Sequence, residues 1–136
     1  MVTRTYKRRN RGFTMIELMI VISIMLILVS VGVPLYQSSV RKARESVLRQ
    51  NLFTMRSVIS QYTLDKQKAP QALEDLVQAS YLKQIPTDPM TGQADWAVDQ
   101  EENTIMSPDE QDQGGIDDVH SASTQIGTNG TAYNTW

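Results

Sequence analysis

Glu17 is the residue of this sequence whose chemistry is hardest to explain by packing alone. It is the only formal charge in the apolar run from Phe13 to Val33. A carboxylate placed in hydrocarbon costs about 2.5–3.5 kcal/mol on insertion scales, so it indicates a function and a partner. Gly12 stands directly before the run. The segment ahead of Gly12 has no acid and five basic residues, Arg4, Lys7, Arg8, Arg9 and Arg11.

The apolar run has the length of a membrane span. A helix of these residues, rising about 1.5 Å per residue, is roughly 30 Å long, which matches the hydrocarbon core of a bilayer. Basic residues ahead of a span favour a cytoplasmic N-terminus. We therefore predict a transmembrane helix over 13–34 and a C-terminal region on the far side of the membrane.

The combination of a basic leader, Gly12, an aromatic residue and Glu17 resembles the N-terminal signal of type IV pilins and type II secretion pseudopilins. The resemblance is closest to the major, G-type, pseudopilin. It implies that a membrane-embedded peptidase removes the leader, 1–12, by cutting after Gly12, and that the new amine of Phe13 is methylated. It also implies a role in assembly for Pro34, which stands where many of these proteins bend their helix.

Glu17 suits a role in setting the register between subunits. After cleavage the amine of Phe13 is a cation at the membrane surface, one helical turn from the carboxylate. In a bundle of identical helices, Glu17 of one subunit can neutralise the amine of a neighbour, and low dielectric strengthens that attraction while desolvation offsets much of it. We hypothesise that subunits dock where this pair forms.

The C-terminal region offers one candidate metal site. Asp117, Asp118 and Ser121 carry hard oxygen atoms of the kind that calcium takes, and the resemblance to major pseudopilins implies a calcium site in this loop. The chain departs from that family because no acid follows Asp118. A hydrogen-bonded turn with surface acids is the alternative that we favour.

Composition excludes several other functions. The chain has one histidine, His120, and no cysteine, which argues against a zinc site or a disulfide. Asp118 and Ser121 near His120 are not expected to form a catalytic triad with it, because adjacent residues of a strand point to opposite faces. Removal of the leader leaves eight basic and fifteen acidic side chains, a net charge of −7, so the mature region is a poor nucleic-acid ligand. We predict a protein without enzymatic activity.

The helix is expected to continue past Pro34 as an amphipathic segment over 35–69, since no glycine or proline interrupts Leu35–Lys68. Apolar residues recur at spacings of three and four and form one stripe, Leu48, Leu52, Met55, Ile59 and Tyr62. Charged residues are predicted on the other faces: Arg41, Lys42, Arg44, Glu45, Arg49 and Arg56. Pro34 is predicted to bend or loosen the helix because it removes a backbone bond.

A small globular domain is predicted over 70–136. It begins with a short helix, Gln71–Ala79, and continues through a Pro-rich turn, Ile85–Gly92, that resembles the pseudopilin loop before the sheet. The predicted strands are Ala94–Asp99 (with Trp96 and Val98 on one side), Asn103–Ser107 and Ile116–His120, and Trp136 is expected to pack back on the core. The fold class is α+β: a long N-terminal helix, half transmembrane and half amphipathic, packed on a small antiparallel sheet.

The resemblance implies a structural subunit that polymerises through its N-terminal helix into a type II secretion pseudopilus for export of folded proteins. Its implied partners are further copies in a helical filament, the prepilin peptidase/N-methyltransferase, an inner-membrane platform protein and minor pseudopilins. The implied location is the bacterial inner membrane, single-pass with the C-terminus in the periplasm, and a periplasmic or extracellular filament after assembly. A type IV pilin, major or minor, is the alternative. The second alternative is a secreted or membrane-tethered binding domain with an ordinary signal peptide, cut near Ser30–Gly32.

Overall fold

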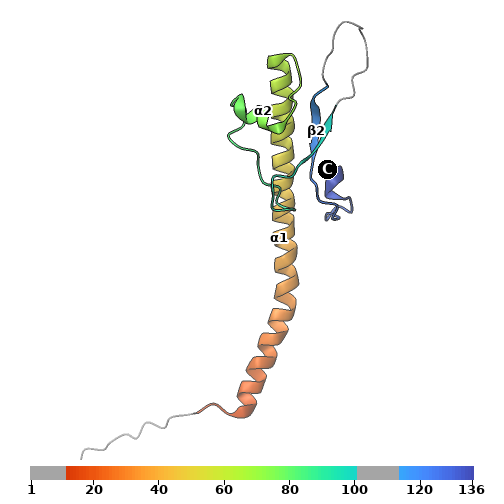
Figure 1. The fold of residues 1–136 in the computed structure, drawn as a ribbon. Coiled ribbons are helices and arrows are strands. Elements are labelled where there is room, and N and C mark those ends of the chain that lie inside the picture. Colours follow the sequence, from red (N-terminus) through yellow and green to blue (C-terminus); the bar gives the residue numbers. More distant parts are fainter. Residues whose placement is uncertain (1–11, 101–113) are drawn as a thin grey trace, which may run out of the picture. The chain divides into compact units, whose positions relative to one another are not determined.

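The computed structural model describes residues 12–100 and 114–136. Most of the predicted leader and the predicted strand Asn103–Ser107 lie outside the described residues. The chain divides into two compact units, Met1–Ser39 and Val40–Trp136, and helix α1 (Met15–Lys66) supplies residues to both (Figure 1). The unit Val40–Trp136, here called the second unit, also holds the remaining helices and the sheet.

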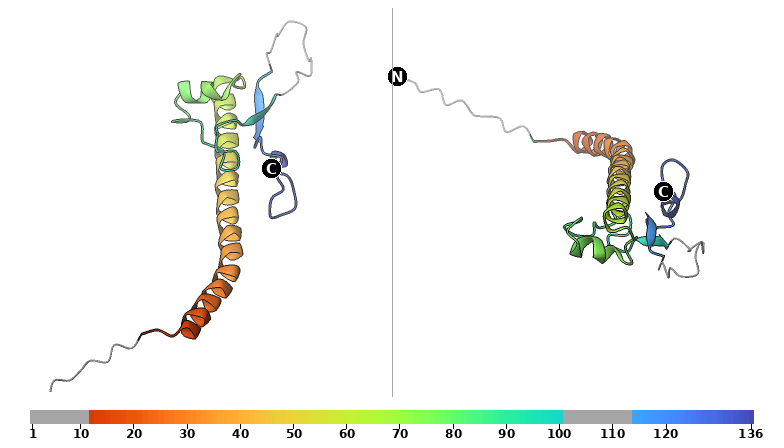
Figure 2. Two further views of the ribbon diagram at one scale, coloured as in Figure 1. Left: turned by 60° about the horizontal axis from the view of Figure 1, so that its bottom comes forward. Right: turned by 90° about the horizontal axis from the view of Figure 1, so that it is seen from above.

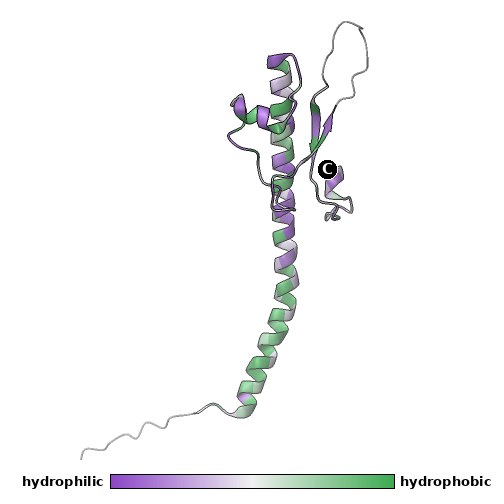
Figure 3. Cartoon of the chain, in the orientation of Figure 1, coloured by the Kyte–Doolittle hydropathy of each residue, from purple (hydrophilic) through white to green (hydrophobic). Residues whose placement is uncertain are grey.

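The part of α1 in the first unit is apolar and has no core around it. Every residue from Gly12 to Ser39 is exposed in the isolated chain. An 18-residue window of α1 near the N-terminus reaches a mean hydropathy of 2.8 with none of it buried, so by length and composition the helix can cross a membrane. The concentration of apolar residues in this part of α1 is visible in Figure 3.

The later part of α1 carries the predicted apolar stripe. Leu48, Leu52, Met55, Ile59 and Tyr62 are all buried, which confirms the spacing argument. One assignment was wrong: Glu45 was placed on a solvent face, but it is 2% exposed. It lies three residues before Leu48 and therefore continues the same stripe by one turn.

Helix α2 (Leu73–Gln78) is shorter than the predicted helix Gln71–Ala79. Asp75 closes its first turn by accepting hydrogen bonds from the backbone N–H groups of Gln71 and Ala72, at 2.9 and 3.1 Å. Leu73 and Leu76 are buried against the α1 stripe. The residues at either end of the predicted helix serve as its caps and turns.

The sheet has two described strands. Strand β1 (Ala97–Gln100) pairs antiparallel with β2 (Ile116–His120), with Val98 opposite Val119 and a bulge between Asp99 and Gln100. Both strands lie in the second unit beside the later part of α1 (Figure 2). Ile116 and Val119 of β2 complete the core with the α1 stripe.

The prediction for β2 is confirmed residue by residue, whereas β1 begins later than the predicted Ala94–Asp99. Trp96 precedes β1 and is buried, while Val98, expected on the same side, is 38% exposed. Trp96 lies outside the strand pairing, and its indole Nε1–H donates to the carbonyl of Pro86 at 2.7 Å. The fold class is the predicted α+β, and a short 3-10 helix, Tyr133–Thr135, lies near residue 136.

Two positions in the loops of the second unit, Gly92 and Gly115, require glycine. Gly92 has φ of +77°, a conformation that glycine adopts at no steric cost, and its N–H donates to the Asp88 carbonyl at 2.8 Å. Gly115 lies so close to Ala69 that a Cβ at Gly115 would stand 2.6 Å from the Ala69 Cβ. The close approach lets the Ile116 N–H donate to the Pro70 carbonyl and fixes the start of β2 beside the end of α1.

Candidate functional site

The predicted processing and assembly residues lie at the start of α1. Gly12 and Phe13 precede the helix, and Phe13 is 84% exposed. Glu17 is in the first turn of α1 and is also exposed. Within residues 12–100 and 114–136 its carboxylate has no hydrogen-bond or ion-pair partner. The structure therefore presents Gly12, Phe13 and Glu17 on an accessible apolar segment.

The start of α1 also contains a cap that our sequence analysis missed. The Glu17 backbone N–H donates to the hydroxyl of Thr14 at 3.2 Å, and the Leu18 N–H donates to the Thr14 carbonyl. The signal was available, because Thr14 and Glu17 have the Ser/Thr-x-x-Glu spacing of a capping box. Thr14 is thus the N-cap residue directly before Met15, and its hydrogen bond gives Glu17 a fixed position in the first turn.

Pro34 lies inside α1, which stays helical on both sides of it. A proline has no N–H to give to the carbonyl four residues earlier, so this turn of α1 has one backbone bond fewer than its neighbours. Gly32 is two residues away, with open space around the position of its missing Cβ. The assembly role predicted for Pro34 stays a prediction.

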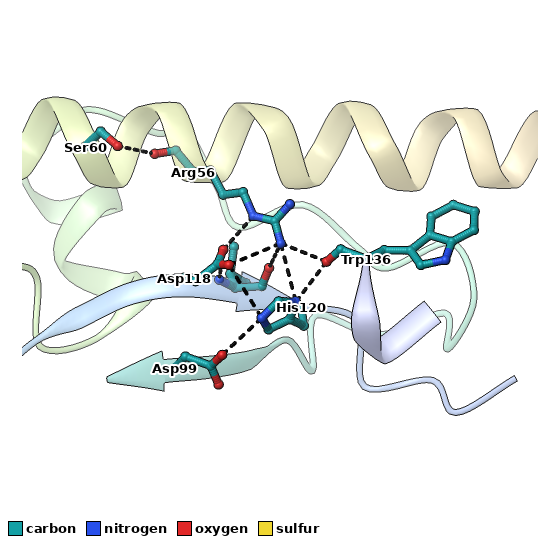
Figure 4. A network of polar contacts seen from close by, with 7 residues as sticks. Arg56, Ser60, Asp99, Asp118, His120 and Trp136 are labelled. Atoms are coloured by element: carbon teal, nitrogen blue, oxygen red, sulfur yellow. Dashed lines mark hydrogen bonds and ion pairs between the residues drawn. The ribbon is translucent and has the colours of Figure 1, made fainter. Parts of the chain in front are cut away.

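A polar network centred on Arg56 links α1 to the sheet and to residue 136 (Figure 4). The guanidinium donates from Nε to Asp118 Oδ1 at 2.5 Å and from Nη2 to Asp118 Oδ2 at 3.4 Å. The same Nη2 donates to the carbonyl of Val119 at 3.1 Å and to the main-chain oxygen of Trp136 at 2.7 Å. His120 extends the network to β1, with Nε2 lying 3.0 Å from Asp99 Oδ2 and Nδ1 lying 2.8 Å from the main-chain oxygen of Trp136.

Asp118 is held in its charged form by this network. Partial burial of the carboxyl works against the charge, but the hydrogen bonds from Arg56 and from the Val119 N–H outweigh it. The pKa of Asp118 is consequently lowered from its ordinary value. The carboxylate is a structural ion-pair partner here.

The three predicted calcium ligands do not converge on a common point. Asp118 is engaged by Arg56, whereas Asp117, its neighbour on β2, is exposed. Ser121 is buried, and its hydroxyl donates to the carboxylate of Asp88, a buried residue of the turn before the sheet. No group of three or more acidic or histidine side chains suited to a metal occurs in the described part of the chain. The donor set of Asp117, Asp118 and Ser121 therefore does not fit calcium in the described residues.

A second network, also missed by sequence reasoning, surrounds Glu45. Its carboxylate accepts hydrogen bonds from the Thr128 N–H at 2.8 Å, from the Thr128 hydroxyl, and from the Tyr133 hydroxyl at 2.9 Å. Arg41, one turn earlier, lies 3.9 Å from the carboxylate. Burial of Glu45 would raise its pKa, but these hydrogen bonds and the Arg41 charge lower it overall. Glu45 and Arg56 thus tie two points of the segment 121–136 to α1.

Comparison with known sequences identifies the N-terminal segment. Residues 7–33 match the family model described as the prokaryotic N-terminal methylation motif. This range contains Gly12, Phe13 and Glu17. No solved structure matches the chain.

Similarity to curated proteins extends well beyond that motif. The chain is 30% identical to type II secretion system core protein G of Klebsiella michiganensis, over 63% of this chain and 72% of the relative. It is 31% identical to the protein of the same name from Escherichia coli, over 60% of this chain and 67% of the relative. Prepilin peptidase-dependent protein D of Escherichia coli is 40% identical, but over only 42% of this chain. The match to core protein G thus includes much of the second unit, and the chain belongs to the type II secretion system core protein G family of pseudopilins.

Proposed function

We propose that this pseudopilin is a structural subunit that polymerises through the exposed apolar part of α1 into a type II secretion pseudopilus. The proposal is carried by one observation: a helix segment with mean hydropathy 2.8 has no core around it and has Glu17 as its only charge. Such a surface is stable in lipid or against identical helices, and it is unstable in water. The relatives named core protein G support the secretion system as its setting.

Cleavage after Gly12 is the step that prepares this segment for assembly. It removes five basic residues and creates a cation at Phe13, close to Glu17 on the first turn. The prepilin peptidase that methylates this amine is the proposed first partner. The methylation motif over residues 7–33 supports that assignment.

Glu17 sets the axial register between neighbouring subunits. Its carboxylate lacks a partner in the described part of its own chain, and leaving it unpaired among apolar helices is costly. Pairing with the Phe13 amine of an adjacent copy removes that cost at one relative height of the two helices. The filament then grows by repeating the same pair.

The proposed location follows from the same helix. Before assembly α1 anchors the chain in the inner membrane with the second unit in the periplasm, in accord with the basic leader. An inner-membrane platform protein and minor pseudopilins are the proposed assembly partners, and export of folded proteins is the proposed outcome. We propose no catalytic step for this chain.

Filament formation by Glu17→Gln tests the proposal. Gln keeps the size and polarity of the side chain but removes its charge. We expect the variant to insert in the membrane and to be processed at wild-type levels, while sheared filaments fall by about tenfold or more, as for a lost charge pair worth at least about 1.4 kcal/mol in low dielectric.

Ser23→Ala is the matched control. Ser23 is the next polar side chain of the span, and its hydroxyl donates to the Met19 carbonyl of its own helix at 2.8 Å. It needs no partner from another subunit, so this variant should form filaments at wild-type levels. Wild-type filament yield from Glu17→Gln would contradict the register role of Glu17.

A further inference from the structure

The guanidinium of Arg56 donates hydrogen bonds to several oxygen atoms of the types that bind calcium in proteins. It reaches both carboxylate oxygens of Asp118, the main-chain carbonyl of Val119 and the main-chain oxygen of Trp136, at 2.5 to 3.4 Å. Carboxylate and main-chain carbonyl oxygens are the ligands that calcium prefers. Arg56 comes from α1, whereas these acceptors come from β2 and from residue 136.

Two further side chains with oxygen atoms in this region, Ser121 and Asn129, are engaged by neighbouring residues, whereas Asp117 is exposed. Ser121 gives its hydroxyl hydrogen to Asp88, and the N–H of Ser123 donates back to the Ser121 oxygen at 3.1 Å. Asn129 accepts hydrogen bonds from the N–H and the hydroxyl of Thr131, at 3.1 and 2.9 Å. The sequence has no acid after Asp118 that could complete a divalent-cation site in this segment.

We infer that Arg56 is the built-in cation that fastens segment 121–136 to α1 and β2, at the place where the pseudopilin resemblance implies calcium. A guanidinium suits this role because its planar fork binds a carboxylate through two nitrogens and stays charged at all physiological pH values. The second unit therefore folds without calcium. The inference concerns this unit alone and stands whether or not the chain polymerises.

Thermal unfolding of the full-length chain in detergent micelles tests the inference. Trp96 and Trp136 both lie in the second unit and report its unfolding by fluorescence. A calcium ion present at about 100 times its dissociation constant would raise the Tm of a domain of this size by on the order of 10 °C. We expect the wild-type Tm to be the same in millimolar calcium and in excess chelator, and a calcium-dependent rise would overturn the inference.

Arg56→Gln tests the role of the arginine itself. It keeps an amide donor but removes the charge, and we expect the Tm to fall by on the order of 5 °C or more, with smaller loss in Arg56→Lys, which keeps the charge without the fork. Arg44→Gln is the matched control, since it removes the same charge from an exposed position of α1. Equal melting of Arg56→Gln and Arg44→Gln would overturn the inference. If Arg56→Gln does not fold, the wild-type comparison in calcium and chelator still decides.

Discussion

Glu45 combines deep burial with a carboxyl group whose pKa is lowered in the second unit. It is almost completely buried, yet its carboxylate has three hydrogen-bond donors from Thr128 and Tyr133 and a nearby guanidinium from Arg41. Buried charges are tolerated when their hydrogen-bonding capacity is met, and removing one member leaves the others unsatisfied. Glu45 therefore acts as an anchor for the segment that contains Thr128.

Replacing Glu45 with Ala should destabilise the second unit by about 1.5–3 kcal/mol, since hydrogen bonds to a charged group are lost and the hydroxyl of the buried Tyr133 loses its acceptor. Urea unfolding followed by tryptophan fluorescence measures the change. Glu74→Ala, which removes an exposed carboxylate on α2, is the control and should stay within about 0.5 kcal/mol of the wild type. An equal loss in both variants would argue against the anchor role.

Stability should also depend on pH, with a definite sign. The pKa values of Glu45 and Asp118 are both lowered in the folded chain. The unfolded chain therefore binds protons at a higher pH than the folded chain does, and the stabilisation is fully present above the ordinary carboxyl pKa of about 4. It is lost as the pH falls through the lowered values.

We accordingly expect the free energy of unfolding to decrease below about pH 5, and to decrease less steeply in Glu45→Gln, which cannot take up that proton. Urea unfolding at a series of pH values from neutral to acid measures both slopes. An unchanged slope in Glu45→Gln would mean that Glu45 does not contribute to the acid sensitivity.

At the scale of elements, the apolar stripe of α1 is what holds the second unit together. Leu52 is 2% exposed and lies between α1 and the rest of the core, whereas its neighbour Phe53 is 71% exposed. Because Leu52 and Phe53 are adjacent in sequence but differ in burial, substitutions at the two positions test the effect of burial. Helix propensity is similar for both substitutions to Ala, so burial decides the difference.

Leu52→Ala should cost about 2–5 kcal/mol of unfolding free energy because it leaves a cavity in the core. Phe53→Ala should change it by less than about 1 kcal/mol. Urea unfolding of both variants under the same conditions gives the comparison. A larger loss in Phe53→Ala would show that the stripe has been placed on the wrong face.

Periodicity predicted α1 and its buried stripe well, because spacings of three and four fix a helical face over many turns. The assignment of Glu45 was wrong because a charged residue was expected on another face. Its spacing of three from Leu48 already places it on the buried stripe. Strand β2 was also predicted, since Ile116 and Val119 are apolar residues in a short run bounded by polar segments. The start of β1 was not predicted correctly. Trp96 lies outside the strand and donates a hydrogen bond to Pro86 that no local sequence pattern reveals.

The candidate sites also differ in whether a local sequence pattern or a contact between distant residues defines them. Gly12, Phe13 and Glu17 were predicted from local features of the sequence, a basic leader and a charge within an apolar run, and their roles stay predictions. The Arg56 network was not predicted, since Arg56 is separated from its partners by 62 residues or more along the chain and meets them only in the folded structure. Calcium was predicted from the oxygen atoms of Asp117, Asp118 and Ser121 and from the family resemblance, and no pattern in the sequence pairs Asp118 with Arg56.

At the scale of the whole molecule, the chain combines an exposed apolar segment, 12–39, with a second unit whose segment 121–136 is held to the later part of α1 by side chains. The first feature requires lipid or further copies of the chain, and the second provides a folded unit for each copy. The proposed pairing between subunits depends on removal of the leader, because only then does an amine appear near Glu17. The account therefore rests on where the mature chain begins.

Mass spectrometry of the N-terminal peptide from filaments of the native host tests this most directly. We expect the mature chain to begin at Phe13 with one methyl group on its amine. Gly12→Glu should keep the leader and form no filaments, whereas Gly32→Ala, a glycine change in open space within α1, should be processed normally. Filaments whose subunits begin at Met1, or at an unmodified Phe13, would contradict the account.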